Sequence, residues 1–205
     1  MTIEEYKRKI AQVFENLEVI NNSTPNKYLK ISELCKYSDQ RINCNSLTAQ
    51  NYIGVDNLLQ DTQGKTDSNF VLTSGTATAY KAGDILLSNI RPYLKKIWFA
   101  DIDGGSSNDV LVLQKTNDTI ISKYLYYNLK QDKFFDYEMQ GIKGMKMPRG
   151  DKKQIMNYQI FVPSLSEQQE IVAEIETYEV KIAEAQKVMS EAGEKKKAIL
   201  EKFMR

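Results

Sequence analysis

Apolar residues recur alternately every four and every three residues near the end of the chain, from Ile171 to Phe203, with Lys196 as the exception. This spacing gives a long helix one narrow apolar stripe, as in a coiled coil. A helix over residues 167–205 would extend about 58 Å at 1.5 Å per residue, so a stripe of that length requires a partner helix. The stripe supplies our candidate dimerisation residues, which are Ile171, Ile175, Tyr178, Ile182, Ala185, Met189, Ile199 and Phe203.

Two partner helices are consistent with this stripe. Residues 3–18 are amphipathic, with Tyr6, Ile10, Val13 and Leu17 spaced four, three and four residues apart, so they form one candidate within the chain. A second copy of the chain is the other candidate. The alternative is a helix that lies along its own domain, for which the stripe is too narrow and too long.

The region before the long helix combines glycine with positive charge. Gly141, Gly144 and Gly150 allow the backbone to approach a partner closely, and Pro148 restricts the loop. The basic residues of this loop suit an anionic partner and become candidate contacts. They are Lys143, Lys146, Arg149, Lys152 and Lys153.

The junction between this loop and the long helix has its own signals. We expect an apolar strand over residues 155–162, ended by Pro163. Ser166 followed by Gln169 predicts a capping box at the start of the helix.

Short strand-like runs separated by polar turn clusters fill residues 27–113. A helix is expected over residues 119–139, where we expect Tyr and Phe to pack between helix and sheet rather than stack on bases. The expected strands are 28–31, 52–55, 70–72, 84–87, 96–100 and 110–113. The expected fold class is α/β (α+β), a domain with a mixed, twisted β-sheet followed by a long C-terminal coiled-coil helix. Its parts would be an N-terminal helix (1–18), a central domain (19–163) and the long helix (164–205).

Composition excludes several classes of function. The chain has 28 basic and 27 acidic residues and no histidine, which rules out Cys/His zinc sites and His-dependent catalytic triads. Residues 19–166 hold 18 basic and 14 acidic residues, so the middle is mildly basic. Cys35 and Cys44 are expected to be free thiols in the core. The N-terminus is no signal peptide, and no apolar run approaches the roughly 20 residues that span a bilayer. We therefore expect a cytoplasmic protein.

No catalytic motif is present. Asn89–Tyr93 only superficially resembles the Asn-Pro-Pro-Tyr signature of amino-methyltransferases, because Ile90 and Arg91 intervene. No glycine-rich loop for a nucleotide is found, and the acids around 101–109 are ordinary turn formers. The remaining interpretation is that the chain recognises nucleic acid, because a guanidinium suits a phosphate or a guanine edge. Its further candidates are Arg91, Lys95 and Lys96, and the polar loop residues Gln40, Arg41 and Asn43.

Three blocks of the sequence resemble the specificity (S) subunit of type I restriction–modification systems. They are GDILLSNIRPYLKKIWFADIDGGSSNDVLVL (83–113), GIKGMKMPRGDKKQIMNYQIFVPSLSEQQEIV (141–172) and the heptad helix beyond. NYIGVDNLL (51–59) is similar to the target-recognition domain of the same family.

The resemblance implies a non-catalytic reader of double-stranded DNA without a cofactor of its own. In this family the helices pair, set the spacing of two half-sites and dock the methyltransferase (modification) subunits, which use S-adenosylmethionine. Restriction subunits join them and use ATP and Mg. Family members usually contain two recognition domains and two helical regions, whereas one of each is visible here, so the chain resembles a half-subunit. A homodimer would then read an interrupted palindrome. The alternative function is a coiled-coil adaptor without nucleic-acid recognition.

Overall fold

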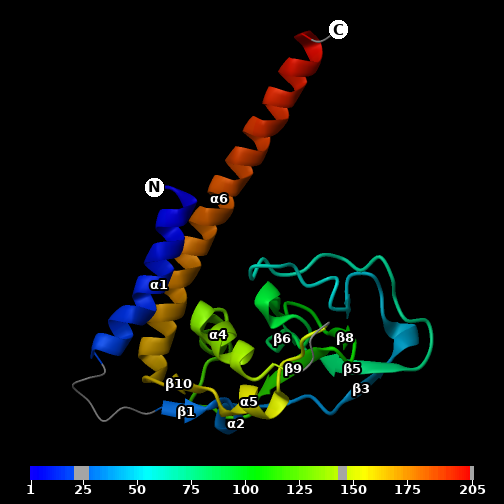
Figure 1. The fold of residues 1–205 in the computed structure, drawn as a ribbon, viewed down its shortest axis with the longest axis vertical. Helices are drawn as coiled ribbons and strands as arrows, with labels where there is room; N and C mark the ends of the chain where they lie inside the picture. Colours follow the sequence, from blue (N-terminus) through cyan, green and yellow to red (C-terminus); the bar gives the residue numbers. More distant parts are fainter. Residues whose placement is uncertain (21–27, 143–146, 204–205) are drawn as a thin grey trace. The chain divides into compact units, whose positions relative to one another are not determined.

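The computed structural model describes residues 1–20, 28–142 and 147–203. The chain forms two compact units, one of residues 27–168 and one that joins residues 1–26 to 169–205. None of the helices in the described segments carries an apolar stretch sufficient for a bilayer crossing. The order of the elements is drawn in Figure 1.

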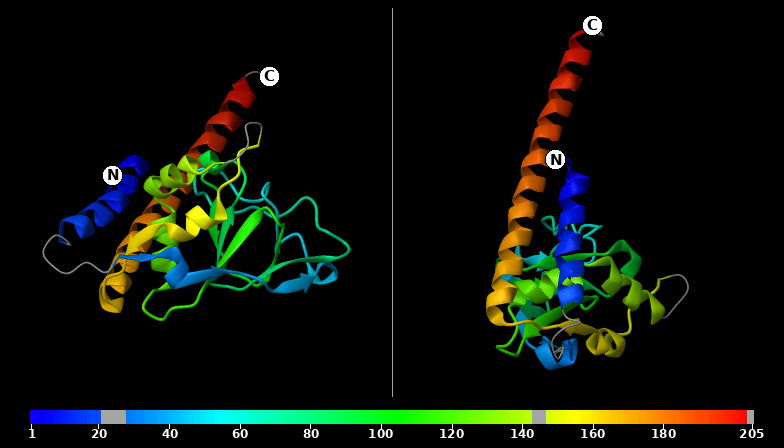
Figure 2. Two further views of the ribbon diagram at one scale, coloured as in Figure 1. Left: turned by 60° about the horizontal axis from the view of Figure 1, so that its bottom comes forward. Right: turned by 90° about the vertical axis from the view of Figure 1, so that its left-hand side faces the viewer.

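The smaller unit is a pair of helices. Helix α1 (Ile3–Ile20) runs alongside α6 (Leu165–Phe203), as Figure 1 and the right-hand view of Figure 2 show. The rings of Tyr6 and Tyr178 are 6.3 Å apart. Lys9 lies over the Tyr178 ring and Lys181 over the Tyr6 ring, so the helices are antiparallel. The candidate partner helix within the chain is therefore present.

The larger unit contains two four-stranded sheets among its described residues. One sheet is antiparallel, in the order β2 (Cys35–Tyr37), β9 (Val110–Lys115), β6 (Ile85–Ser88) and β7 (Ile97–Phe99). The other is mixed, in the order β3 (Arg41–Asn43), β5 (Thr76–Tyr80), β8 (Gly104–Ser106) and β4 (Tyr52–Ile53), with β4 and β8 parallel. The predicted fold class of mixed, twisted sheets followed by a long helix is confirmed.

Strand β6 lies at the centre of the core. All four of its residues are buried, which explains its continuous apolar sequence, since both faces are covered. Leu86 packs in one cluster with Trp98 and Val112. Burying a leucine side chain stabilises a fold by about 1.5–3 kcal/mol, so these central strands form the rigid base for the loops between them.

Three short helices and a small sheet complete this unit. They are α3 (Ser122–Leu129), α4 (Asp132–Gln140), α5 (Lys152–Asn157) and the antiparallel pair β1 (Tyr28–Lys30) and β10 (Gln159–Phe161); the one-turn helices α2 (Ile31–Leu34), η2 (Cys44–Ser46) and η3 (Pro92–Leu94) connect strands. The Tyr126 ring contacts that of Phe99 at 5.5 Å, and Phe134 and Phe135 are buried. The prediction that these aromatics belong to the core is confirmed. Cys35 and Cys44 are buried free thiols, as expected.

The structure corrects several predicted elements. Residues 155–162 are not one strand, because α5 occupies the first part and only Gln159–Phe161 is extended. The expected helix over 119–139 is two helices, and 70–72 forms no strand. The capping box is made by Ser164 and Glu167, not by Ser166 and Gln169. The Ser164 hydroxyl accepts from the Glu167 N–H at 3.3 Å, and the Glu167 carboxylate accepts from the Ser164 N–H at 2.9 Å.

The glycine-rich segment 104–106 is a strand rather than the expected turn. A Cβ on Gly104 would collide with the Asn51 carbonyl oxygen and with the Tyr80 ring. The Asn51 oxygen accepts hydrogen bonds from the Gly105 N–H at 3.0 Å and from the Tyr80 hydroxyl at 2.9 Å. Glycine is therefore required here by the close approach of a neighbouring backbone.

Candidate functional site

The structure joins two segments that the sequence offered separately as candidate sites. Ile90 and Arg149 form an isolated antiparallel bridge. The Arg91 N–H donates to the Pro148 carbonyl at 2.8 Å, and the Gly150 N–H donates to the Asn89 carbonyl at 3.1 Å. The loop after β6 and the end of the basic loop therefore form one surface.

Asp109 ties a third segment to this surface. Its backbone carbonyl accepts from the Asn89 N–H at 2.8 Å. Its carboxylate lies 3.2 Å from the Arg149 guanidinium, and both side chains remain partly exposed. Such a pair contributes at most about 1 kcal/mol, so it orients Arg149 without locking it.

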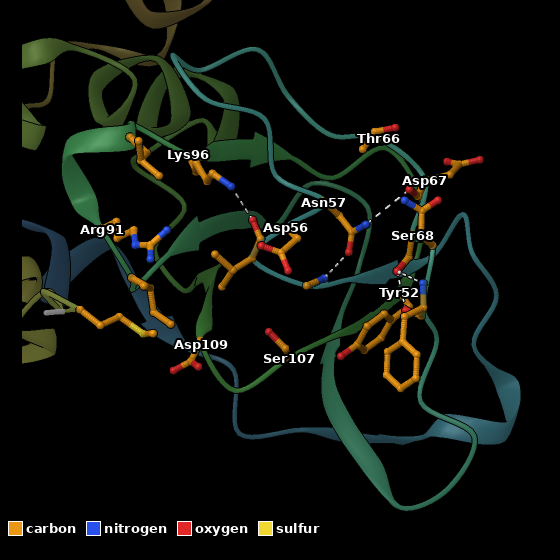
Figure 3. A pocket seen from close by; sticks show the side chains of 17 residues that line it. Tyr52, Asp56, Asn57, Thr66, Asp67, Ser68, Arg91, Lys96, Ser107 and Asp109 are labelled. Carbon is orange, nitrogen blue, oxygen red and sulfur yellow. Dashed lines mark hydrogen bonds between the residues drawn. The ribbon is translucent and has the colours of Figure 1, made fainter.

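A groove of about 610 Å³ opens beside these segments. Figure 3 shows Arg91 and Asp109 on one side of it, and Asp67, Ser68 and Tyr52 on the other. We call it the central groove. The side chains labelled there are Tyr52, Asp56, Asn57, Thr66, Asp67, Ser68, Arg91, Lys96, Ser107 and Asp109.

Polar and apolar side chains both line the central groove, which carries charges of both signs. Asp56, Asp67 and Asp109 contribute carboxylates, and Arg91 and Lys96 contribute cations. Lys96 is buried, and its ammonium donates to the Val55 carbonyl at 2.8 Å. Burial lowers the pKa of Lys96, and Arg91 adds to this effect while Asp56 opposes it. The Lys96 ammonium is thus part of the groove wall.

Arg91 differs from the other candidates in its backbone conformation and in the availability of its guanidinium group. Its φ of 52° and ψ of 63° lie in the left-handed region, where it caps η3 (Pro92–Leu94). Its side chain is exposed. Within segments 1–20, 28–142 and 147–203, no hydrogen bond or ion pair is formed by its guanidinium. Arg91 therefore presents a full set of donors to the groove.

Lys95 and the residues of the 38–45 loop have partners of their own. The Lys95 ammonium lies 2.8 Å from the Asp132 carboxylate. Arg41 donates to the Thr78 hydroxyl at 2.9 Å and to the Thr76 carbonyl at 2.8 Å. The Asn43 side chain accepts from the Asn45 N–H at 2.9 Å and caps η2. The side chains of Lys95, Arg41 and Asn43 are therefore engaged by other groups of the protein.

Gln40 and the basic residues of α5 are exposed. Gln40 lies beside β5, where its carbonyl accepts from the Ala79 N–H at 2.9 Å. The Lys152 ammonium lies 6.0 Å from the centre of the Tyr37 ring, whereas the Lys153 side chain points to solvent. Asp151 caps α5 by accepting from the Lys153 and Gln154 N–H groups. Lys143 and Lys146 lie outside the described residues.

Glu138 was missed by sequence reasoning. Its side chain is 1% exposed, and neither carboxylate oxygen has a hydrogen-bond partner among the described residues. It lies directly beneath Gly150, next to Asn89 Oδ1, which also lacks a partner there. Burial raises the pKa of Glu138 to about 8. No local pattern distinguishes it, since α4 carries other acids that are exposed.

The predicted dimerisation stripe divides into a covered and an uncovered part. Ile171 and Ile175 are buried, and Tyr178, Ile182 and Ala185 are half-buried. Beyond them, the Met189 side chain is 65% exposed. The side chains of Ile199 and Phe203 lie outside the described part of the chain.

Comparison with known proteins identifies one family. Residues 4–190 match the family model described as "Type I restriction modification DNA specificity domain". The type I restriction enzyme EcoDI specificity subunit of Escherichia coli is 29% identical over 109 residues, which are 52% of this chain and 24% of that protein.

Solved structures share the fold. A chain from a study of complex assembly and conformational transition of the type I R-M system gives a TM-score of 0.61 at 17% identity, over 96% of this chain and 53% of that one. The HsdS subunit from Thermoanaerobacter tengcongensis gives 0.56 at 16% identity, over 91% and 49%. The S subunit from M. genitalium gives 0.56 at 13% identity, over 97% and 52%. The chain thus spans about half the length of these structures.

Proposed function

The chain belongs to the family of type I restriction–modification DNA specificity domains, and on this premise we propose that it reads a half-site in double-stranded DNA. The observation that carries the proposal is the bridge between Ile90 and Arg149, which gathers Arg91 and Arg149 on one exposed surface. Guanidinium groups are the side chains best suited to both guanine edges and phosphates. An adaptor without nucleic-acid recognition would have no use for this arrangement.

The second part of the proposal concerns assembly. Two copies would pair along the uncovered part of the α6 stripe, beyond Ala185, where Val188 and Met189 are each 65% exposed. A two-fold axis would relate two identical reading surfaces, so the target would be a palindrome interrupted by a spacer. The helices would also dock methyltransferase subunits, which in turn join the restriction subunits.

No catalytic step is assigned to this chain. Methyl transfer with S-adenosylmethionine, and cleavage with ATP and Mg, would belong to the partner subunits. The membership of the chain in this family supports this part of the proposal.

Selection of randomised duplex DNA by the purified chain tests the proposal. Enrichment of a two-part palindrome with a fixed spacer would support both the reading and the pairing of two copies. Enrichment of one half-site would support the reading and reject the symmetric pair. Absence of any enriched sequence, together with no retention on heparin at low salt, would reject the reader and favour the adaptor.

A further inference from the structure

We propose that Arg91 is a specificity-determining residue that reads a guanine edge through the central groove. This inference rests on the proposed function and deepens it, because it assigns one side chain to a base rather than to a phosphate. It follows from three features of Arg91, which are its free donors, its fixed backbone and the carboxylates beside it.

The first feature is the freedom of the guanidinium. The neighbouring cations are engaged, since Lys96 donates to Val55, Lys65 pairs with Asp67 at 2.9 Å and Arg149 pairs with Asp109. Within the described segments, the Arg91 guanidinium has neither a hydrogen bond nor an ion pair. A planar guanidinium can donate two parallel hydrogen bonds to guanine O6 and N7. Of these four cations, Arg91 is the one whose donors no group in the described segments engages.

The second feature is the backbone that carries this side chain. Arg91 adopts φ 52°, which is costly for a residue with a Cβ unless the surroundings enforce it. Its N–H donates to the Pro148 carbonyl at 2.8 Å, and its carbonyl accepts from the Leu94 N–H at 2.9 Å. The next residue, Pro92, is buried. These contacts fix the Cα of Arg91, as the reading of a single base edge requires.

The third feature is the charge of the groove itself. Asp56, Asp67 and Asp109 line the same hollow as Arg91. Asp67 is paired with Lys65 and Asp109 with Arg149, so among the described residues Asp56 is the carboxylate of the groove without an ion pair, and it disfavours a phosphate close by. A carboxylate accepts instead from the amino group of cytosine, the partner of guanine. The groove therefore offers a carboxylate acceptor beside the donors of Arg91, a combination that suits a G·C base pair.

The test repeats the DNA selection with wild type, Arg91→Asn and Arg91→Lys. Asparagine tolerates the left-handed backbone, and lysine keeps the charge but loses the fork of donors. Arg91→Asn is expected to lose the preference for one G·C pair by about 10- to 100-fold and to retain the rest of the motif. Arg91→Lys should lose most of that preference as well. Thermal unfolding of both variants checks that the fold persists.

A phosphate contact would give a different result and would overturn the inference. Affinity would then fall alike for all sequences, and the slope of log affinity against log salt would shrink by about one. An unchanged motif in both variants would overturn it too, while leaving the proposed function intact. A wild-type chain that enriches no sequence would contradict the proposed function and the inference with it. Arg8→Gln, which removes an exposed charge on α1, is the matched control and should keep the motif.

Discussion

Ile90 and Arg149 form a backbone bridge between the loop after β6 and the segment before α5. Gly150, the next residue, closes the junction by donating to the Asn89 carbonyl at 3.1 Å. Beneath it lies the buried Glu138 carboxylate. The surface that carries Arg91 and Arg149 thus rests on the close packing of Gly150 against the buried Glu138 carboxylate.

Gly150→Ala should destabilise this support. A Cβ at position 150 would collide with Glu138 Oε1, and the buried carboxylate has little room to move. We expect the free energy of unfolding to fall by about 1–3 kcal/mol, measured by urea denaturation. Gly193→Ala is the control, because its Cβ meets nothing within 4 Å inside helix α6. It should leave stability unchanged or raise it by about 0.5–1 kcal/mol, and equal losses in both variants would refute the packing argument.

Glu138 should make stability fall as pH rises. Burial raises its pKa from 4.5 to about 8 in the folded chain, whereas the unfolded chain releases this proton near the ordinary value. Between those values the folded chain holds more protons, so the free energy of unfolding decreases with pH by up to about 1.4 kcal/mol per unit. The chain has no histidine, so few other groups titrate there.

Glu138→Gln should flatten that dependence. An amide stays neutral and can donate toward Asn89 Oδ1, so the variant should gain stability over wild type as pH rises from 5 to 8. Urea denaturation across this range provides the measurement. The control is Asp136→Asn on the exposed face of the same helix, which should retain the wild-type slope. A wild-type curve that is flat from the outset would show that Glu138 is ionised in the fold.

The sequence predicted those elements in which apolar residues recur regularly or form a continuous run. The α6 stripe and the apolar runs of β6 and β9 follow directly from period and composition. Gly104–Ser106 could not be recognised as a strand, because its glycines matter through the approach of Asn51, a tertiary contact. Residues 152–157 form only six residues of helix, too few to show a helical period against the apolar run that follows.

The candidate site was predictable in parts but not as a whole. Arg91 and Arg149 were identified by their turns and charges, yet their meeting depends on the single bridge between Ile90 and Arg149. The engagement of Lys96 with the Val55 carbonyl is likewise a long-range contact. Local sequence can suggest which residues carry charge, but only the fold determines which of them are free.

Lys153 is expected to contact a phosphate, because it is exposed on α5. Lys153→Ala should weaken binding to all duplexes alike and reduce the salt slope by about 0.9. Fluorescence anisotropy at several salt concentrations, with the selected duplex and a scrambled one, measures both quantities. Lys195→Ala, on the exposed far part of α6, serves as the control and should leave the slope unchanged. A loss confined to the selected duplex would instead assign Lys153 to base reading.

Pairing of two copies along α6 should depend on the uncovered part of its stripe. Met189 follows Ala185 in the four–three spacing and is 65% exposed, so a second copy would bury it. Met189→Glu would place an unpaired charge in that contact and should raise the dimer dissociation constant about tenfold or more, measured by light scattering over a concentration series. Ser190→Glu adds the same charge one residue away, outside the stripe, and should leave the dimer intact. Equal effects of the two substitutions would place the contact elsewhere, and a wild-type monomer at micromolar concentration, with and without DNA, would refute the pairing itself.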